Sequence, residues 1–387
     1  MLSVQFIISG ALSIVPPVIP LILPTLGVHA AGAVRSWAGI LVGVTPLAAA
    51  LMSPQWGRLA DRMDRRLIIL ISCGAAAFCT VSMSLATNPW QLLGLRFTMG
   101  LFGGYVAAGL SIVSTATPMH RLGWALGCLA TGQIAGTLLG PLLGGAIADA
   151  FASLRAPFLL AGGAVLLVGG AVAFVPATAP PQWNRPMEDG TCHAARMERH
   201  GKVRSLVVTL LLAQCAIMIT QPIISLHVRE LVGVRADLAT LAGLAFSVVG
   251  LSGLLAAPLI GTLSDRIGAD RLLFCVLIVA AVFVLPQAYA TTYGWFVAER
   301  FLSGLFLCSV IPVVHTLVGK MVPEQDRSRA FGVTSGAAFL GAFVGPVSGG
   351  LLGAEFGLSA VFLFSACILS MTALWISINI WPGHRAR

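Results

Sequence analysis

Charged side chains are scarce in this sequence. Asp, Glu, Lys and Arg make up 10% of its 387 residues, whereas 57% are hydrophobic. A soluble domain carries roughly 25% charged residues because water must wet its surface. The composition therefore excludes a soluble globular protein and makes lipid the solvent for most of the chain. A hydrocarbon core about 30 Å thick takes roughly 20 apolar residues per helix, so the length allows about twelve spanning helices.

Several motifs of other protein classes are also absent. The eight cysteines lie singly, with no C-x-x-C pair and no His at ligand spacing, so we predict neither disulfides nor a metal site. The sequence has no G-x-x-x-x-G-K-[ST] loop for ATP and no H-E-x-x-H motif. It also has no basic run interleaved with aromatic residues, so the net charge of +9 does not predict a nucleic-acid partner.

Apolar stretches of spanning length fill most of the chain. Scanning for them places spans at roughly 2–24, 36–57, 67–86, 89–114, 123–148, 155–176, 205–228, 238–262, 271–290, 293–319, 328–353 and 357–380. The one long polar interruption, 177–204, holds three prolines and five basic residues. It predicts a cytoplasmic linker between an N-terminal six-helix bundle (1–176) and a C-terminal one (205–387).

The distribution of Lys and Arg predicts the orientation. Most of these residues fall in loops on the linker's side of the membrane, whereas the opposite loops hold only Arg35, Arg155, Arg229 and Arg235. Basic loops resist translocation, so we expect the linker and both chain ends in the cytoplasm.

Three motifs recur in order along the chain. P-x-x-G-x-L-x-D-R occupies 54–62 and returns 204 residues later at 258–266. R-x-x-x-G begins at Arg96 and, with the same offset, at Arg300. G-x8-G-x3-G-P-x2-G-G then occurs at 127–145 and 332–350, offset by 205. We therefore expect an all-α integral membrane fold of twelve transmembrane helices in two pseudo-symmetric six-helix bundles, related by an axis along the membrane normal.

These segments resemble a known family. The loop GRLADRMDRR, the fourth-span RFTMG and the fifth-span GCLATGQIAGTLLGPLLGG resemble signature motifs of the major facilitator superfamily. The last is similar to the antiporter motif of twelve-span drug:proton antiporters, and GWALG before it resembles bacterial multidrug-resistance and tetracycline exporters. The resemblance covers essentially the whole chain. It departs in two places: Asp64 replaces a usual Gly, and the first span has no acid, its only strongly polar side chain being Gln5.

The first repeated motif predicts a conformational gate. Asp61 can accept hydrogen bonds from the free N–H groups of a neighbouring helix N-terminus, an attraction worth about 0.3–2 kcal/mol. The resemblance implies that Asp61 latches the two bundles in the outward-facing state. Asp64 tolerates left-handed geometry, so we expect the turn to survive there. Topology alone is the alternative role for the arginines. The gate set is Gly57, Asp61, Arg62, Arg65, Arg66, Gly261, Asp265 and Arg266.

The antiporter motif has two interpretations. Its glycines let another helix backbone approach closely, and Pro141 permits a bend. In the family, this motif is interpreted as a seal that favours exchange. The alternative is packing within each bundle, which would explain why the motif recurs in the eleventh span. The motif residues are Gly127, Gly136, Gly140, Pro141, Gly144 and Gly145.

Titratable groups at membrane depth are few, and each is a candidate for proton coupling: Arg96, Glu299, Arg300 and His315. Arg96 is the family's fourth-span arginine. The alternatives are a cation fixed by carbonyls for Arg96, snorkelling to the outer interface for Glu299 and Arg300, and packing for His315.

Family topology assigns the central cavity to spans one, four, seven and ten. It nominates Met99, Tyr105, Gln214, Met218, Gln221 and Cys308. Met side chains and amides suit amphiphilic solutes of varied shape, although a Met stripe also suits a core.

We therefore predict a secondary active exporter in a bacterial inner membrane. It would act as a monomer, move small amphiphilic compounds in exchange for protons, and need no cofactor beyond the coupling proton. A symporter or facilitator for a small metabolite is the alternative, and a membrane-embedded enzyme is the least favoured class.

Overall fold

Helices account for nearly all of the chain that the computed structural model describes, which is residues 2–103, 122–174, 201–322 and 327–379. Within these ranges ten segments are long and apolar enough to cross a membrane. The predicted fourth and fifth spans border the undescribed residues 104–121 and correspond to α5 (Pro89–Leu101) and α7 (Leu122–Ala150). The predicted all-helical membrane fold is confirmed.

We call the helices before and after residues 175–200 the N-half and the C-half. The N-half comprises α1 (Leu2–Ser13), α2 (Val15–Ile22), η1 (Leu23–Leu26), α3 (Ala31–Arg62), α4 (Arg65–Ser84), α5, α7 and α8 (Ala156–Ala173). The C-half comprises α10 (Gly201–Met218), η3 (Gln221–Ile223), α11 (Ile224–Val232), α12 (Leu238–Ile267), α13 (Ala269–Val284), η4 (Leu285–Tyr289), α14 (Tyr293–Leu307), α15 (Val310–Met321), α16 (Arg327–Phe356) and α17 (Leu358–Asn379).

The linker end is the end of the molecule at which α8 finishes and α10 begins. The far end is the opposite one, at which α7 finishes and α12 begins. The predicted linker, 177–204, lies mostly outside the described residues, and its last four positions already belong to α10. The proposed division into bundles stays a prediction.

Local capping follows the sequence repeat. Asn88 and Thr292, which are 204 residues apart, accept hydrogen bonds from the backbone N–H groups of Gln91 (2.9 Å) and Trp295 (3.4 Å) at the starts of α5 and α14. The turn between α3 and α4 survives at Asp64 as expected, but with φ −59° and so without left-handed geometry. Asp64 instead caps α4 by accepting from the Arg66 N–H at 3.0 Å, a role its short carboxylate performs well.

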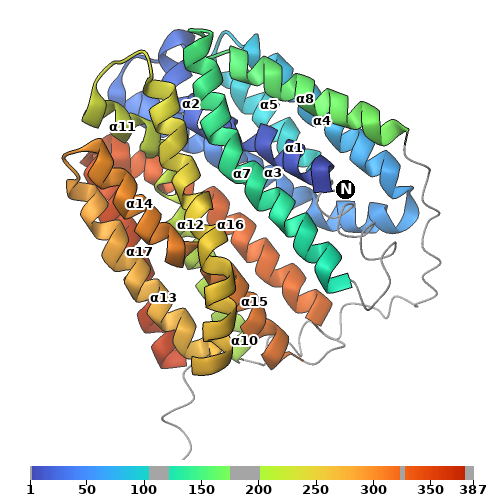
Figure 1. The fold of residues 1–387 in the computed structure, drawn as a ribbon, viewed down its shortest axis with the longest axis vertical. Coiled ribbons are helices and arrows are strands. Elements are labelled where there is room, and N and C mark those ends of the chain that lie inside the picture. Colours follow the sequence, from blue (N-terminus) through green and yellow to red (C-terminus); the bar gives the residue numbers. More distant parts are fainter. Residues whose placement is uncertain (1, 104–121, 175–200, 323–326, 380–387) are drawn as a thin grey trace, which may run out of the picture.

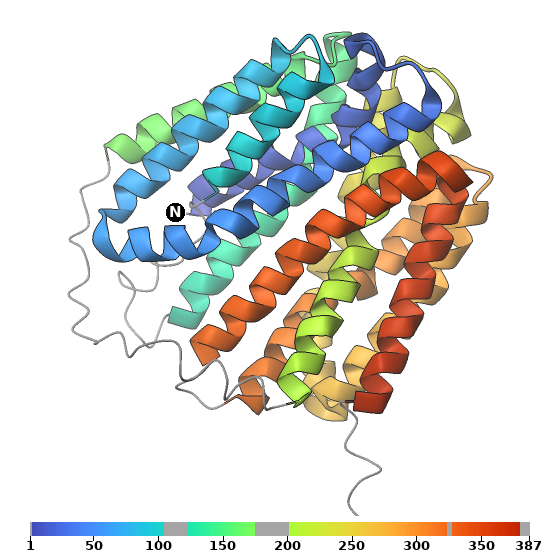
Figure 2. The ribbon, with the colours of Figure 1, turned by 180° about the vertical axis from the view of Figure 1, so that it is seen from behind.

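The halves meet through two pairs of long helices. α3 packs against α16, and α7 packs against α12. Figure 1 shows α7 and α12 close together at the far end and spreading toward the linker end, and Figure 2 shows the same for α3 and α16 from behind.

The surroundings of the glycines show where the contact between the halves is tight. A Cβ on Gly39 of α3 would overlap the Pro346 carbonyl oxygen and lie 2.9 Å from the Cα of Gly350, both in α16. Toward the linker end of α16, a Cβ on Gly332 or Gly336 would meet no atom within 4 Å. The described helices are therefore closed at the far end and open toward the linker end.

We expect Gly39→Ala to destabilise the protein by about 1–3 kcal/mol, because the neighbour it meets is backbone and cannot rotate away. Gly336→Ala is the matched control: the same change in open space should leave stability unchanged or raise it by about 0.5–1 kcal/mol. Thermal unfolding midpoints in detergent test this. A Gly39→Ala midpoint equal to that of the control would contradict the tight contact.

Candidate functional site

Three of the four helices assigned to the central cavity are interrupted near their middles, and the fourth continues into residues that the structure does not describe. The first span breaks between Ser13 and Val15, and the seventh runs from α10 through η3 into α11. The tenth breaks at Cys308 and Ser309, between α14 and α15. Breaks inside a membrane leave backbone groups for other partners and are typical of helices that line a cavity.

Arg96 and Arg300 make the same contact in the two halves. The Arg96 guanidinium donates through Nε to the carbonyl oxygen of Leu41 in α3. The Arg300 Nε donates to the carbonyl oxygen of Ala245 in α12 at 2.7 Å. Each arginine lies 55 residues after its acceptor, so the sequence repeat is reproduced in space.

Both arginines are buried, with 4% of Arg96 and 6% of Arg300 exposed. Arg300 therefore does not snorkel to an interface, and that alternative is wrong. Each side chain ties its own helix to a neighbour in the same half, as expected for a cation fixed by a carbonyl. The Nη1 of Arg96 has no hydrogen-bond partner among the described residues.

Glu299 is buried as well, with 4% exposed, and its Oε2 has no hydrogen-bond partner in the described part of the chain. Its carboxyl also forms a hydrogen bond with the side chain of Trp295, one turn nearer the far end, so the snorkelling alternative stays open for Glu299. Nearby, Gln287 donates to the Ser303 hydroxyl at 3.0 Å, which joins η4 to α14. Glu299 is thus a carboxyl held inside the C-half.

His227 is a buried titratable residue that was not among the predicted site residues. Only 4% of this residue is exposed, and neither ring nitrogen has a described partner. Its ring lies edge-on to Phe296 and Phe362, with centroids 4.9 and 5.2 Å away. The Arg300 guanidinium carbon stands 5.8 Å from the Phe296 ring centre. Its position inside the predicted span 205–228 was the sequence signal that could have identified it as a titratable group at membrane depth.

His315 lies apart from this group. It is half-buried in α15, near the linker end, with its ring 5.5 Å from that of Phe331 in α16. Fifteen residues separate it from Arg300, which is roughly 20 Å of helix. The structure thus brings Arg300 and His227 together around Phe296, with Glu299 next to Arg300 in the chain, and His315 is not part of this group.

The nominated cavity residues divide into two groups. Gln214, Met218 and Gln221 are half-buried around the break of the seventh span, and the Gln214 Oε1 has no described partner. Cys308 is exposed and its thiol donates to the Val249 carbonyl oxygen at 3.5 Å. Met99 is buried in the N-half core, and Tyr105 lies outside the described residues.

The antiporter-motif glycines lie at two different helix contacts. Cβ atoms on Gly136, Gly140 and Gly144 would strike α1 or the residue after it, so these three glycines pack the N-half. A Cβ on Gly145 would overlap the Ala239 carbonyl oxygen of α12, in the other half. The Pro141 carbonyl oxygen similarly faces Gly243 of α12. The motif therefore contributes both to packing within the N-half and to the contact between the halves, and its role as a seal stays a prediction. Gly127 lies within α7, and its surroundings are outside the described part.

The second copy repeats this division. Gly341, Gly345 and Gly349 abut the end of α10 and the residue after it, whereas Gly350 lies against the Arg35 carbonyl oxygen and Gly39 of α3. The recurrence in the eleventh span is thus explained by equivalent contacts in the two halves.

The predicted gate lies at the linker end. Asp61 and Asp265 fall in the last turns of α3 and α12. Arg66 donates to the Ala173 carbonyl oxygen of α8, within the N-half, and Arg266 is exposed. The surroundings of the remaining gate positions are outside the described part, so the gate stays a prediction. These positions are Gly57, Asp61, Arg62, Arg65, Gly261 and Asp265.

Because only a guanidinium presents a fixed Nε–H to the carbonyl, Arg96→Lys and Arg300→Lys should each destabilise the protein by about 1–3 kcal/mol. The exposed Arg266→Lys should change nothing. Thermal unfolding midpoints of the three variants test this. Parental stability in both buried variants, with transport lost in Arg96→Lys alone, would contradict equivalent tying roles.

Comparisons with known proteins agree with this architecture. The family model described as Major Facilitator Superfamily matches residues 1–235 and 206–382. "Multidrug resistance protein MdtG" of Dickeya zeae (strain Ech586) is 36% identical over 378 residues, covering 97% of this chain and 92% of the relative. The protein of that name from Salmonella typhi is 35% identical over 384 residues, covering 99% and 94%.

Two solved structures share the fold. A bacterial homolog of the human lysosomal transporter Spinster, in an inward-facing and occupied conformation, aligns with TM-score 0.80 and 16% identity, covering 98% of this chain and 94% of the other. A D-xylose-proton symporter aligns with TM-score 0.78 and 16% identity, covering 98% and 97%. By its family match and its near full-length relatives, this chain belongs to the Major Facilitator Superfamily.

Proposed function

We propose that this chain exports amphiphilic drugs or toxic compounds in exchange for protons. The observation that carries the proposal is the near full-length similarity, at 35–36% identity, to proteins named for multidrug resistance. The sequence resemblance to the antiporter motif points the same way. The likeness to a D-xylose-proton symporter, at 16% identity, bears on the fold alone and does not favour metabolite uptake.

Alternating access accounts for the arrangement of the helices. The basic loops argue for a cytoplasmic linker end, with both termini on that side of a bacterial inner membrane. The state described here then opens to the cytoplasm and is closed on the other side. Substrate would enter from the cytoplasm or the inner leaflet, and rocking of the halves would expose it outside. A monomer contains every part of this cycle.

The region around the break of the seventh span is the proposed substrate site. The Gln214 amide oxygen is buried without a described partner, and Met218 and Gln221 lie close to Gln214 along the chain. An amide can donate or accept a hydrogen bond, and a thioether side chain repacks cheaply around different shapes. Such a site suits varied amphiphilic molecules.

Proton exchange supplies enough energy. One proton crossing about 100 mV gains about 2.3 kcal/mol, and one pH unit adds about 1.4 kcal/mol. Together these support roughly a 500-fold gradient of a neutral solute. We propose Glu299 as the coupling carboxyl, because it is buried within a span with one oxygen unpartnered in the described structure.

Purified protein in liposomes should move a fluorescent amphiphilic cation or neutral dye against its gradient when a pH gradient is imposed. A protonophore should abolish this movement. Uptake of the dye in the same direction as the protons would indicate symport, and no pH-driven movement by correctly inserted protein would contradict the proposal.

Glu299→Gln should uncouple transport, because an amide cannot take up the proton. We expect downhill dye exchange to persist while pH-driven accumulation is lost. Glu355→Gln, at an exposed position near the end of α16, is the matched control and should behave as the parent. His315→Gln measured alongside tests the other candidate. Full pH-driven accumulation by Glu299→Gln would remove Glu299 from the coupling mechanism.

A further inference from the structure

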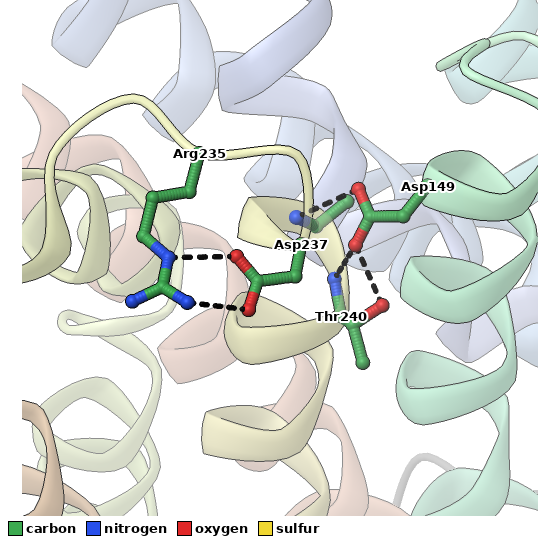
Figure 3. Close-up of polar contacts among 5 residues, drawn as sticks. Asp149, Arg235, Asp237 and Thr240 are labelled. Atoms are coloured by element: carbon green, nitrogen blue, oxygen red, sulfur yellow. Dashed lines mark hydrogen bonds and ion pairs between the residues drawn. The ribbon is translucent and has the colours of Figure 1, made fainter.

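Asp149 at the far end of α7 contacts the start of α12 across the two halves (Figure 3). One carboxylate oxygen accepts a hydrogen bond from the Ala239 N–H at 3.2 Å. The other accepts from both the Thr240 N–H and the Thr240 hydroxyl, each at 2.6 Å. One carboxylate of the N-half thus receives three donors from the C-half.

The two N–H groups belong to helix positions that are normally capped by the N-cap residue of the same helix. Asp237 is the N-cap residue of α12, so Ala239 and Thr240 carry the N–H groups that an N-cap side chain usually satisfies. Asp237 makes no such cap and instead forms an ion pair with Arg235, at 2.9 and 3.1 Å. Asp149 therefore supplies from the other half the cap that α12 lacks.

Apolar packing surrounds this contact. Leu21 of α2, Ala148 of α7 and Ala239 of α12 form one buried cluster that spans both halves. Gly145, one turn before Asp149, lies against the Ala239 carbonyl oxygen. The cap is thus part of the surface that closes the far end, and it cannot persist once α7 and α12 separate there.

The pseudo-equivalent contact has opposite charge. Arg35 of α3 precedes Ala239 by 204 residues, and its Nη1 donates to the Gly353 carbonyl oxygen in the last turn of α16 at 2.9 Å. Its Nη2 also lies 3.4 Å from Glu230 of α11. Each charge thus meets the helix end of opposite polarity, an anion at the start of α12 and a cation at the end of α16.

We propose that Asp149 is a positioning residue for the transport cycle: it caps α12 in trans and holds the far end closed, with Arg35 as its counterpart on α16. Opening the far end must release the start of α12 from its cap. This inference concerns conformation and requires neither drug export nor proton coupling. It complements the gate predicted at Asp61, which would act at the other end of the molecule.

The experiment measures opening of the far end directly. Ala148→Cys places a thiol in the buried cluster, and its rate of alkylation by a maleimide in nanodiscs reports how often the cluster is exposed. Nanodiscs leave both faces accessible, so the readout does not depend on membrane orientation. Asp149→Asn removes the charge while keeping the shape, and Asp237→Asn is the matched control in the same region.

Asp149→Asn should raise the alkylation rate about two- to thirtyfold, the range that corresponds to one charge–helix-end interaction. Arg35→Gln should raise it by a similar factor, and Asp237→Asn should leave it unchanged. Native Cys79, buried in the N-half core, should stay unreactive throughout.

A parental rate in Asp149→Asn would overturn the proposal, as would an equal increase in Asp237→Asn. If Asp149→Asn also exposes Cys79, the variant is unfolding, and Thr240→Val then decides in the same assay. That change removes only the hydroxyl donor, so it should give a smaller increase with Cys79 still protected, and no increase would overturn the proposal.

Discussion

Close approach of helix backbones at the far end is the constraint on which the rest of this structure depends. Lipid offers no hydrophobic force between helices, so small residues and polar ties must hold them together. Gly39 meets Gly350 on one side of the molecule, and Gly145 and Gly243 meet α12 and α7 on the other. These contacts join the halves at one end while the helices spread toward the other (Figures 1 and 2).

A small number of charged side chains supplies the polar ties between the helices. Arg96 and Arg300 tie helices within each half through a backbone carbonyl, whereas Asp149 and Arg35 join the halves through helix ends. In each case a scarce charge meets a backbone dipole. The backbone is always present, so two copies of a repeat can use different side chains and still form equivalent contacts. Opposite signs at Asp149 and Arg35 are an example.

The sequence was enough to predict the helices, the repeat and the family, because apolar length and ordered motifs are local properties. It also identified Arg96 and Arg300, since charge inside a span is conspicuous. The carbonyl groups that accept their hydrogen bonds lie 55 residues away, and only the packing of the helices shows which carbonyls these are. The sequence did not identify Asp149, because an acidic residue at the end of a span is common at the membrane–water interface. Its partner Thr240 is 91 residues distant, a separation that no spacing rule reveals.

In the proposed cycle the halves rock about the middle of the membrane, so that one end closes as the other opens. Pulsed EPR on two label pairs tests it directly: Ala150 with Ala236 at the far end, and Gln55 with Val333 toward the linker end, all at exposed positions. Under conditions that drive turnover, the first distance should lengthen while the second shortens in matching proportions. Distances that stay fixed, or that change in the same direction, would contradict alternating access in this chain.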